Sequence, residues 1–294
     1  MAAVAERFPA ENLRDLAGAD GAGQCHGEST LEDYTWPDGS QGKLLSNPGF
    51  KYDFGWSLTE KGRAQLLKTA DHMEEELDFD DGWIYTSNFQ RSYQSALVLR
   101  ESMSMGFAFL RTEFSGLLDP RKVGDLDGKP SATMAPVYAN DANDVFSTPP
   151  PVPSSLQPSA SVESVQDVYR RALEAITRLE RSYFGSDVVL VSHADTLSIY
   201  AAAMFGTDLG RHHYDWPFEH GQCVVYDQAY VAKGLAPRCF NPNGPIKFSA
   251  TGIVRDVKLE DYLPPPAEAV REFTGDGPSE PQAGSSGLFG RAEA

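Results

Sequence analysis

The sequence is short of cysteine, of positive charge and of long apolar runs, and each shortage excludes a class of protein. The three cysteines, Cys25, Cys223 and Cys239, form no C-x-x-C pair and cannot all be bonded to one another, so neither a disulfide framework nor a cysteine metal site is expected. The formal net charge is −17, which repels nucleic acid and anionic membrane surfaces on average. We therefore expect no nucleic-acid partner and no membrane partner.

No apolar run approaches the roughly 18 residues that a transmembrane helix needs. Residues 1–23 lack the hydrophobic segment of a secretory signal, and Glu6, Glu11 and Asp15 are unusual in an acid-poor transit peptide. A cytoplasmic location is the expectation that remains. Hydrophobic residues nevertheless make up 41% of the 294 positions, which is ordinary for a globular protein that buries a core.

Composition divides the chain into three parts. Residues 1–24 are rich in Ala, Gly and Asp and predict a poorly structured N-terminal segment. Residues 264–294 are rich in Pro and Gly and predict a disordered tail. Between them, residues 25–263 are expected to form one domain, with an exposed loop at 147–161 where Pro and Ser dominate.

Helix and strand patterns alternate within this domain. Helices are predicted after the N-caps Thr59 and Ser164, over residues 89–104, and after the strand at 187–192. Strands are predicted at 83–87, 107–112, 187–192, 222–227 and 252–257. The alternation favours an α/β fold, a three-layer α/β/α sandwich in which helices cover both faces of a mostly parallel central sheet.

Three residues that carry chemistry lie at strand or loop ends, where ligands bind in sheets of this kind. His193 follows the strand at 187–192, Arg91 lies shortly after the strand at 83–87, and His26 precedes the first predicted helix. Any one of them alone is most simply read as a satisfied or solvated side chain. Their shared placement instead predicts a common site.

Six segments occur in an informative order. They are 26–29 (HGES), 58–65 (LTEKGRAQ), 85–96 (YTSNFQRSYQSA), 124–128 (GDLDG), 163–164 (ES) with the helix that follows, and 190–196 (LVSHADT). Together they resemble the motifs of the histidine phosphatase superfamily, the phosphoglycerate mutase-like family. The ordered set is specific, although no single segment is, and the resemblance covers residues 25–230 and implies that family's fold.

The resemblance implies a phosphohistidine mechanism without a metal or a cofactor. His26 would be the nucleophile, while Arg91 and His193 would bind the oxygens of the transferred phosphoryl group. Substrate-binding roles would fall to Gly27, Ser29 and Glu163.

A general acid must also protonate the leaving oxygen. The family usually places a Glu at the position of Pro120, and the nearest carboxylate here is Asp119. Glu113, Asp125 and Asp195 are rivals, although Asp195 is more simply read as a cap on the helix after His193.

Two departures from the family pattern concern the segment before His26. The family has an Arg directly before its nucleophile, whereas this chain has the uncharged Cys25, which loses a charge-assisted contact worth about 1.5–3 kcal/mol. The apolar strand expected there is also missing from residues 14–24. Either the chain is a divergent, weak or inactive member, or residues 1–25 come from an incorrectly assigned first exon, which sequencing the 5′ end of the transcript decides.

The function expected from these residues is that of a phosphomonoester phosphatase acting on a small phosphorylated metabolite. A phosphoglycerate mutase-type phosphotransferase and a catalytically weakened phosphate-binding scaffold are the alternatives, and Pro120 favours the phosphatase over the mutase. His212 and His213 are expected on a loop, and His72 and His220 on the surface. The sequence does not predict an oligomeric state.

Overall fold

The computed structural model describes residues 21–30, 34–35, 41–42, 57–77, 82–103, 109–111, 115–149, 162–182, 187–226 and 237–245. The strands are β1 (Gly21–Cys25), β2 (Tyr34–Thr35), β3 (Gln41–Gly42), β4 (Gly82–Thr86), β5 (Phe109–Arg111), β6 (Asp187–Ser192), β7 (Cys223–Tyr226) and β8 (Arg238–Phe240). The helices are α3 (Glu60–Leu77), α4 (Gln90–Ser102), α5 (Ser115–Leu118), α6 (Ala135–Asp141), α7 (Val165–Ser182), α8 (Ala194–Phe205) and α9 (His212–Asp215), with short 3-10 turns at Gly124–Leu126, Ser131–Met134 and Leu209–Arg211.

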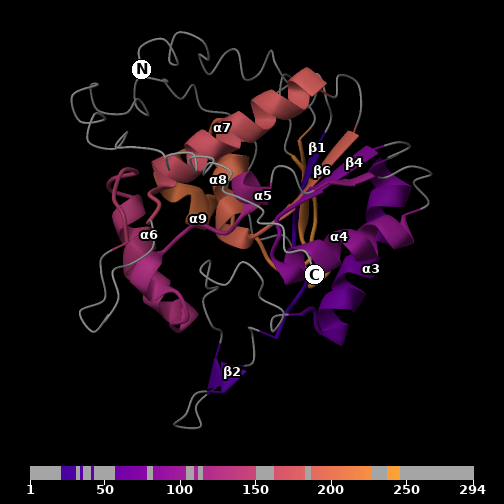
Figure 1. Ribbon diagram of the computed structural model, residues 1–294, viewed down its shortest axis with the longest axis horizontal. Coiled ribbons are helices and arrows are strands. Elements are labelled where there is room, and N and C mark those ends of the chain that lie inside the picture. The colour runs from indigo at the N-terminus through magenta and orange to yellow at the C-terminus, as the bar shows by residue number, and fades with distance from the viewer. Residues whose placement is uncertain are drawn as a thin grey trace, which may run out of the picture.

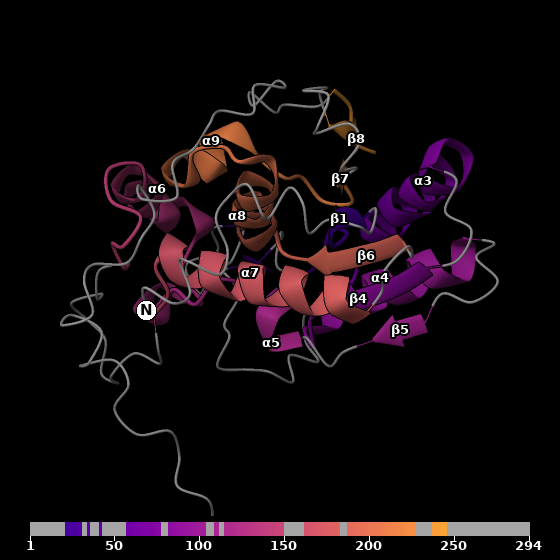
Figure 2. The same ribbon diagram turned by 90° about the horizontal axis from the view of Figure 1, so that it is seen from above.

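The main sheet has the strand order β5-β4-β6-β1-β7-β8. The pairs β5–β4, β4–β6 and β6–β1 are parallel, whereas β1–β7 and β7–β8 are antiparallel. Helices α3 and α4 lie on one side of the sheet, and α7 and α8 lie on the other (Figures 1 and 2). The predicted three-layer α/β fold with a mostly parallel sheet is confirmed.

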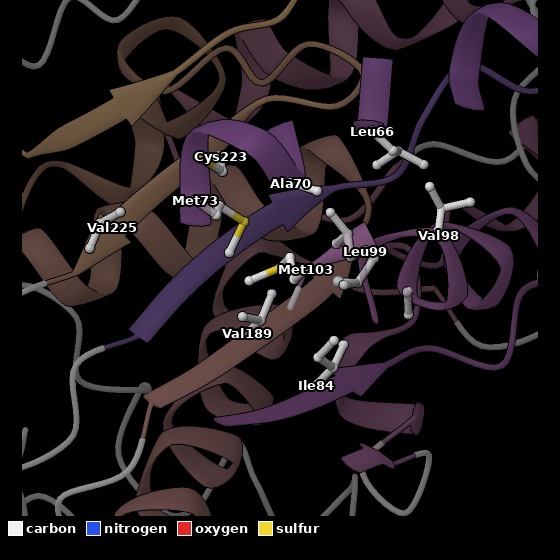
Figure 3. Close-up of a cluster of buried hydrophobic side chains, with 12 residues drawn as sticks. Leu66, Ala70, Met73, Ile84, Val98, Leu99, Met103, Val189, Cys223 and Val225 are labelled. Carbon is white, nitrogen blue, oxygen red and sulfur yellow. The ribbon is translucent and has the colours of Figure 1, made fainter. Parts of the chain in front are cut away.

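Strand β6 shows why the sheet carries helices on both faces. Val189 and Val191 join the cluster formed with α3 and α4, which Figure 3 shows between those helices and strands β4, β6 and β7. Val188 and Leu190, one position along, pack with α7 and α8. Successive side chains of a strand point to opposite faces, so a strand that is apolar at nearly every position requires a layer on each side.

Strand β1 corrects the prediction for residues 21–24, which were expected to be poorly structured. Gly21–Cys25 pairs with β6 on one side and with β7 on the other, in the middle of the sheet. The strand forms without an apolar pattern: a Cβ added to Gly23 would lie at the ordinary contact distance of 3.4 Å from the Leu197 side chain of α8. Backbone hydrogen bonds to two neighbours and the packing of a large residue from α8 replace the usual large strand side chains.

The predicted helix starts are confirmed by their caps. The Gly62 amide donates to Thr59 Oγ1 over 3.0 Å at α3, and the Asp167 amide donates to Ser164 Oγ over 3.2 Å at α7. The Asp167 carboxylate also accepts from the Ser164 amide, which completes a reciprocal capping arrangement. The strands predicted at 83–87, 107–112, 187–192 and 222–227 correspond to β4, β5, β6 and β7.

Several predicted elements lie partly or wholly outside the described residues. The strand expected at 252–257, residues 1–20, most of the Pro/Ser loop and the tail at 264–294 lie outside the described residues, so the domain boundaries stay predictions. Strand β8 was not predicted. Among the described residues, none of the helices is both long enough and apolar enough to cross a membrane.

Candidate active site

The register of the sheet brings the two predicted histidines together. Cys25 of β1 lies opposite Ser192 of β6 in a parallel pair, so His26 and His193 leave the same edge of the sheet side by side. The His26 amide donates to the Ser192 carbonyl over 3.1 Å, which continues the ladder to the nucleophile candidate itself. Arg91 reaches the same edge from the first turn of α4.

Arg91 joins the two imidazoles. Its Nε donates to His26 Nε2 over 3.3 Å and its Nη2 lies 3.0 Å from His193 Nδ1, while the two ring centroids are 5.2 Å apart. Only 2% of Arg91, 7% of His26 and 5% of His193 is exposed. A guanidinium can only donate hydrogen bonds, so both contacted ring nitrogens are acceptors and carry no proton.

The backbone fixes the tautomer of His26. Its Nδ1 lies 2.8 Å from the Gly27 carbonyl, which can only accept, so Nδ1 carries the proton. His26 is therefore a neutral imidazole whose Nε2 lone pair faces Arg91. That is the form a nucleophilic histidine needs.

His193 is held in the opposite tautomer. Since its Nδ1 accepts from Arg91, its Nε2 carries the proton and donates to Ser87 Oγ over 2.9 Å. Burial, followed by the positive charge of Arg91, lowers the pKa of His193 well below its usual value, which favours the neutral ring. The sequence analysis named Ser87 only as part of the 85–96 motif and gave it no role. Its position directly after β4 is the feature that indicates a role at this edge.

Gly27 and Ser29 lie next to His26 on the segment that leads towards α3. A Cβ added to Gly27 would lie 2.5 Å from the Gly62 carbonyl oxygen, so glycine is needed for α3 to approach. The Gly27 amide donates to Ser95 Oγ over 3.1 Å. Ser29 is 1% exposed and its Oγ has no hydrogen-bond partner, which costs stability in the absence of a ligand or water.

Asp119 is brought to the carboxyl end of β6 by its backbone. Its carbonyl accepts from Thr196 Oγ1 of α8 over 3.0 Å, and the neighbouring Leu118 carbonyl accepts from Ser192 Oγ over 2.6 Å. Ser192 directly precedes His193. The chain at Asp119 is thereby tied to residues on either side of His193.

Glu163 anchors the segment that carries Asp119. Its carboxylate accepts from Arg171 and from the Lys122 amide, and Arg171 Nη1 donates to the carbonyls of Leu117 and Asp119 over 2.6 and 2.8 Å. These contacts position the segment 117–122 against α7. Both carboxylate oxygens of Glu163 are engaged in these contacts, and its expected role in substrate binding stays a prediction.

The rivals of Asp119 are placed differently. Asp195 was read as the cap of α8, but His193 occupies the cap position, and Asp195 Oδ1 instead lies 3.0 Å from His212 Nε2. Burial acts to raise the pKa of Asp195, but the hydrogen bond and charge of His212, together with Arg121, lower it to about 2. An acid this strong has no proton to give near neutral pH. Glu113 lies outside the described residues, and Asp125 lies within the 3-10 turn Gly124–Leu126.

The expectations for four histidines are wrong. His212 and His213 were expected on a loop, yet both lie in α9, and His212 is fully buried because Asp195 and the Leu209 carbonyl satisfy both ring nitrogens. His72 and His220 were expected on the surface, yet both are half-buried; the His72 ring stacks on Phe240, and the His220 ring centroid lies 5.3 Å from that of His26. Sequence periodicity carries no information about such contacts between distant segments.

Within the described part of the chain, no group of three or more His, Cys, Asp or Glu side chains is arranged to hold a metal ion. The chemistry that the described groups can support is nucleophilic attack by a neutral imidazole beside a guanidinium, with a second imidazole in reach. That combination suits an anionic group that is transferred through a covalent intermediate.

Comparisons with known proteins agree with this arrangement. Residues 48–235 match the model of the histidine phosphatase superfamily, branch 1, a segment that contains Arg91 and His193 and begins after His26. A search of the curated proteins found no significant match.

Solved structures of similar fold include mycobacterial hydrolase 1, with 19% identity, a TM-score of 0.50, and coverage of 70% of this chain and 90% of that chain. Another is mycobacterial glucosyl-3-phosphoglycerate phosphatase in complex with inorganic phosphate, with 18% identity, a TM-score of 0.50, and coverage of 79% and 98%. At such identities the likeness concerns the fold alone. Because the family model matches well over half of the sequence, the chain belongs to branch 1 of the histidine phosphatase superfamily.

Proposed function

We propose that this protein is a phosphomonoester phosphatase that acts on a small phosphorylated metabolite through a phosphohistidine at His26. The observation that carries the proposal is the pair of contacts from Arg91 to His26 Nε2 and His193 Nδ1. One cation between two neutral imidazoles provides a positive charge for the phosphoryl oxygens and an uncharged nucleophile at the same place.

The reaction has two steps. In the first, His26 Nε2 attacks phosphorus, the N–P bond forms, the P–O ester bond breaks, and Asp119 gives a proton to the leaving oxygen. In the second, water attacks phosphorus and loses a proton to Asp119, a P–O bond forms, and the N–P bond breaks so that its electron pair returns to His26 Nε2 and inorganic phosphate leaves. Arg91 stabilises the charge on the equatorial oxygens in both steps, and His193 does so when a phosphoryl oxygen replaces Ser87 as the acceptor of its Nε2 proton. The Gly27 carbonyl, which accepts from Nδ1 of His26, keeps the proton of that ring off Nε2.

The nucleophile is tested by trapping the intermediate. After rapid mixing of the protein with p-nitrophenyl phosphate and a quench in alkali, ³¹P NMR should show a phosphohistidine, which is stable in alkali and labile in acid. The signal and the turnover should both disappear in His26→Ala. Turnover that persists in His26→Ala would remove His26 as the nucleophile, and the matched control His72→Ala should behave like the unchanged protein.

The general acid is tested by the leaving group. In Asp119→Asn, hydrolysis of an alkyl phosphate should slow by about 10²–10³-fold, because the alkoxide needs a proton to leave. Hydrolysis of p-nitrophenyl phosphate should slow far less, since p-nitrophenolate leaves without help. An equal loss with both substrates would assign Asp119 another role.

The two alternative functions give different products. A mutase would return the phosphoryl group to an acceptor hydroxyl and release little inorganic phosphate, whereas a scaffold would bind phosphate without turnover. Cys25 favours the scaffold, because it is 1% exposed in the strand before His26 and a thiol brings no positive charge. Measured release of phosphate over many turnovers from a panel of monoesters would reject both alternatives.

A further inference from the structure

His26 is flanked by two imidazoles at nearly the same distance. Its ring centroid lies 5.2 Å from that of His193 and 5.3 Å from that of His220. His193 follows β6, whereas His220 lies in the turn that enters β7. We propose that His220 is a third phosphoryl-binding side chain of this site, a proposal that rests on the phosphatase function proposed above.

The turn that carries His220 is bonded to the backbone of the nucleophile. The Gly221 amide donates to the His26 carbonyl over 3.1 Å, and the Cys25 amide donates to the Gln222 carbonyl over 3.0 Å. His220 therefore precedes two residues whose backbones are both fixed to the strand end at His26. A movement of this turn would break the ladder beside the nucleophile.

Helix α3 holds the same turn from the other side. Thr69 Oγ1 donates to the Gly221 carbonyl over 2.6 Å, and Asn243 Nδ2 donates to the His220 carbonyl over 2.7 Å. Asn243 in turn accepts from Gln65 of α3. Gly221 has a φ of +73°, and a Cβ there would lie 2.9 Å from both the Gln65 and Pro242 side chains. The backbone position of His220 is thus set by contacts on two sides.

The chemistry of the site calls for a further hydrogen-bond donor to the phosphoryl oxygens, which the His220 imidazole can supply. A transferring phosphoryl group spreads negative charge over three equatorial oxygens. Arg91 supplies a fork of donors, whereas the proton of His193 is directed at Ser87 and Cys25 adds no charge. The His220 ring lies 5.3 Å from that of His26 and is half-buried rather than enclosed, and the proposal places its ring nitrogen on an anion bound beside His26.

The first test measures affinity for inorganic phosphate by calorimetry. His220→Asn should bind phosphate about tenfold more weakly, the effect of losing one hydrogen bond to a charged group. The matched control is His72→Asn, because the His72 ring stacks on Phe240 with centroids 4.3 Å apart; its affinity should not change. Unchanged affinity in His220→Asn with normal thermal stability would overturn the proposal.

A second measurement distinguishes direct contact between the His220 ring and phosphate from a purely structural role of His220. With ¹⁵N-labelled histidine, the six rings of the chain can be followed as phosphate is added and assigned with single His→Asn variants. The ring nitrogens of His26, His193 and His220 should shift together with one binding constant, while those of His72 should stay. Shifts at His26 and His193 without one at His220 would reject this inference and leave the proposed function standing; no phosphate binding at all would reject both.

Discussion

Arg91 sets the protonation of the site as well as its charge. By donating to one nitrogen of each histidine, it keeps both of those nitrogens free of protons, and the Gly27 carbonyl and Ser87 hydroxyl then hold the remaining protons on the opposite nitrogens. Each ring is fixed in one tautomer before any ligand arrives. Such preorganisation avoids reorganisation during the reaction.

Ser87 should matter for activity although it does not face phosphorus in the proposed mechanism. In Ser87→Ala the buried Nε2–H of His193 loses its acceptor, so we expect kcat/KM for p-nitrophenyl phosphate to fall by about tenfold, equivalent to about 1.4 kcal/mol. Ser198→Ala is the control. Ser198 is equally buried, and its hydroxyl donates from α8 to the Trp216 carbonyl at the end of α9. If both variants lose activity equally, the effect is general destabilisation.

His193 should also make stability depend on pH. Its pKa is lowered in the folded state, whereas the unfolded side chain has a value of about 6.5. Below about pH 6.5 the unfolded state therefore binds a proton that the folded state does not, so stability is fully present above this pH and declines as the pH falls. The contribution to the slope approaches about 1.4 kcal/mol per pH unit.

Urea unfolding of the unchanged protein and of His193→Gln between pH 5 and 8 measures this contribution. The difference in unfolding free energy between the two proteins should shrink as the pH falls below about 6.5. A difference that stays constant across the range would mean that His193 titrates alike in both states.

At the scale of elements, the packing of β1 against α8 limits the size of the side chain that position 23 can carry. We expect Gly23→Ala to stabilise the protein by about 0.5–1 kcal/mol, because a Cβ would meet Leu197 at the ordinary contact distance of 3.4 Å and alanine reduces the entropy of the unfolded chain. Gly23→Leu should instead destabilise by about 1–3 kcal/mol through overpacking against α8. Urea midpoints compare the two, and stabilisation by leucine would show that α8 does not limit the space.

The elements that could be predicted from the sequence are those stabilised mainly by their own residues. The capped helices α3 and α7 and the apolar strand β6 have patterns that local physics explains. Strand β1 has no such pattern, and its pairing with β6 and β7 holds it in place. At the site, His26, Arg91 and His193 follow from strand ends, whereas the approach of His220 to His26 depends on a turn trapped between distant segments, which no periodicity encodes.

At the scale of the whole molecule, the charge of −17 opposes the arrival of an anionic substrate, while Arg91 favours it locally. The Debye length shortens from about 30 Å at 0.01 M salt to about 8 Å at 0.15 M, so added salt should screen the distant acidic groups more than the nearby guanidinium. We expect the affinity for inorganic phosphate to rise about two- to threefold over this range. A steady fall, measured by calorimetry with sodium chloride, would mean that the local positive field dominates.

The reversed direction of β7 has a consequence for how this molecule can change its specificity. Parallel strands offer a site only the segments that leave them, but an antiparallel neighbour offers the segment that enters it, here the four residues from Glu219 to Gln222. Exchanging the His220 side chain alters the surroundings of the nucleophile, while the backbone contacts that tie the turn to α3 and to His26 stay in place. Specificity can therefore change at this single corner while the rest of the architecture stays the same.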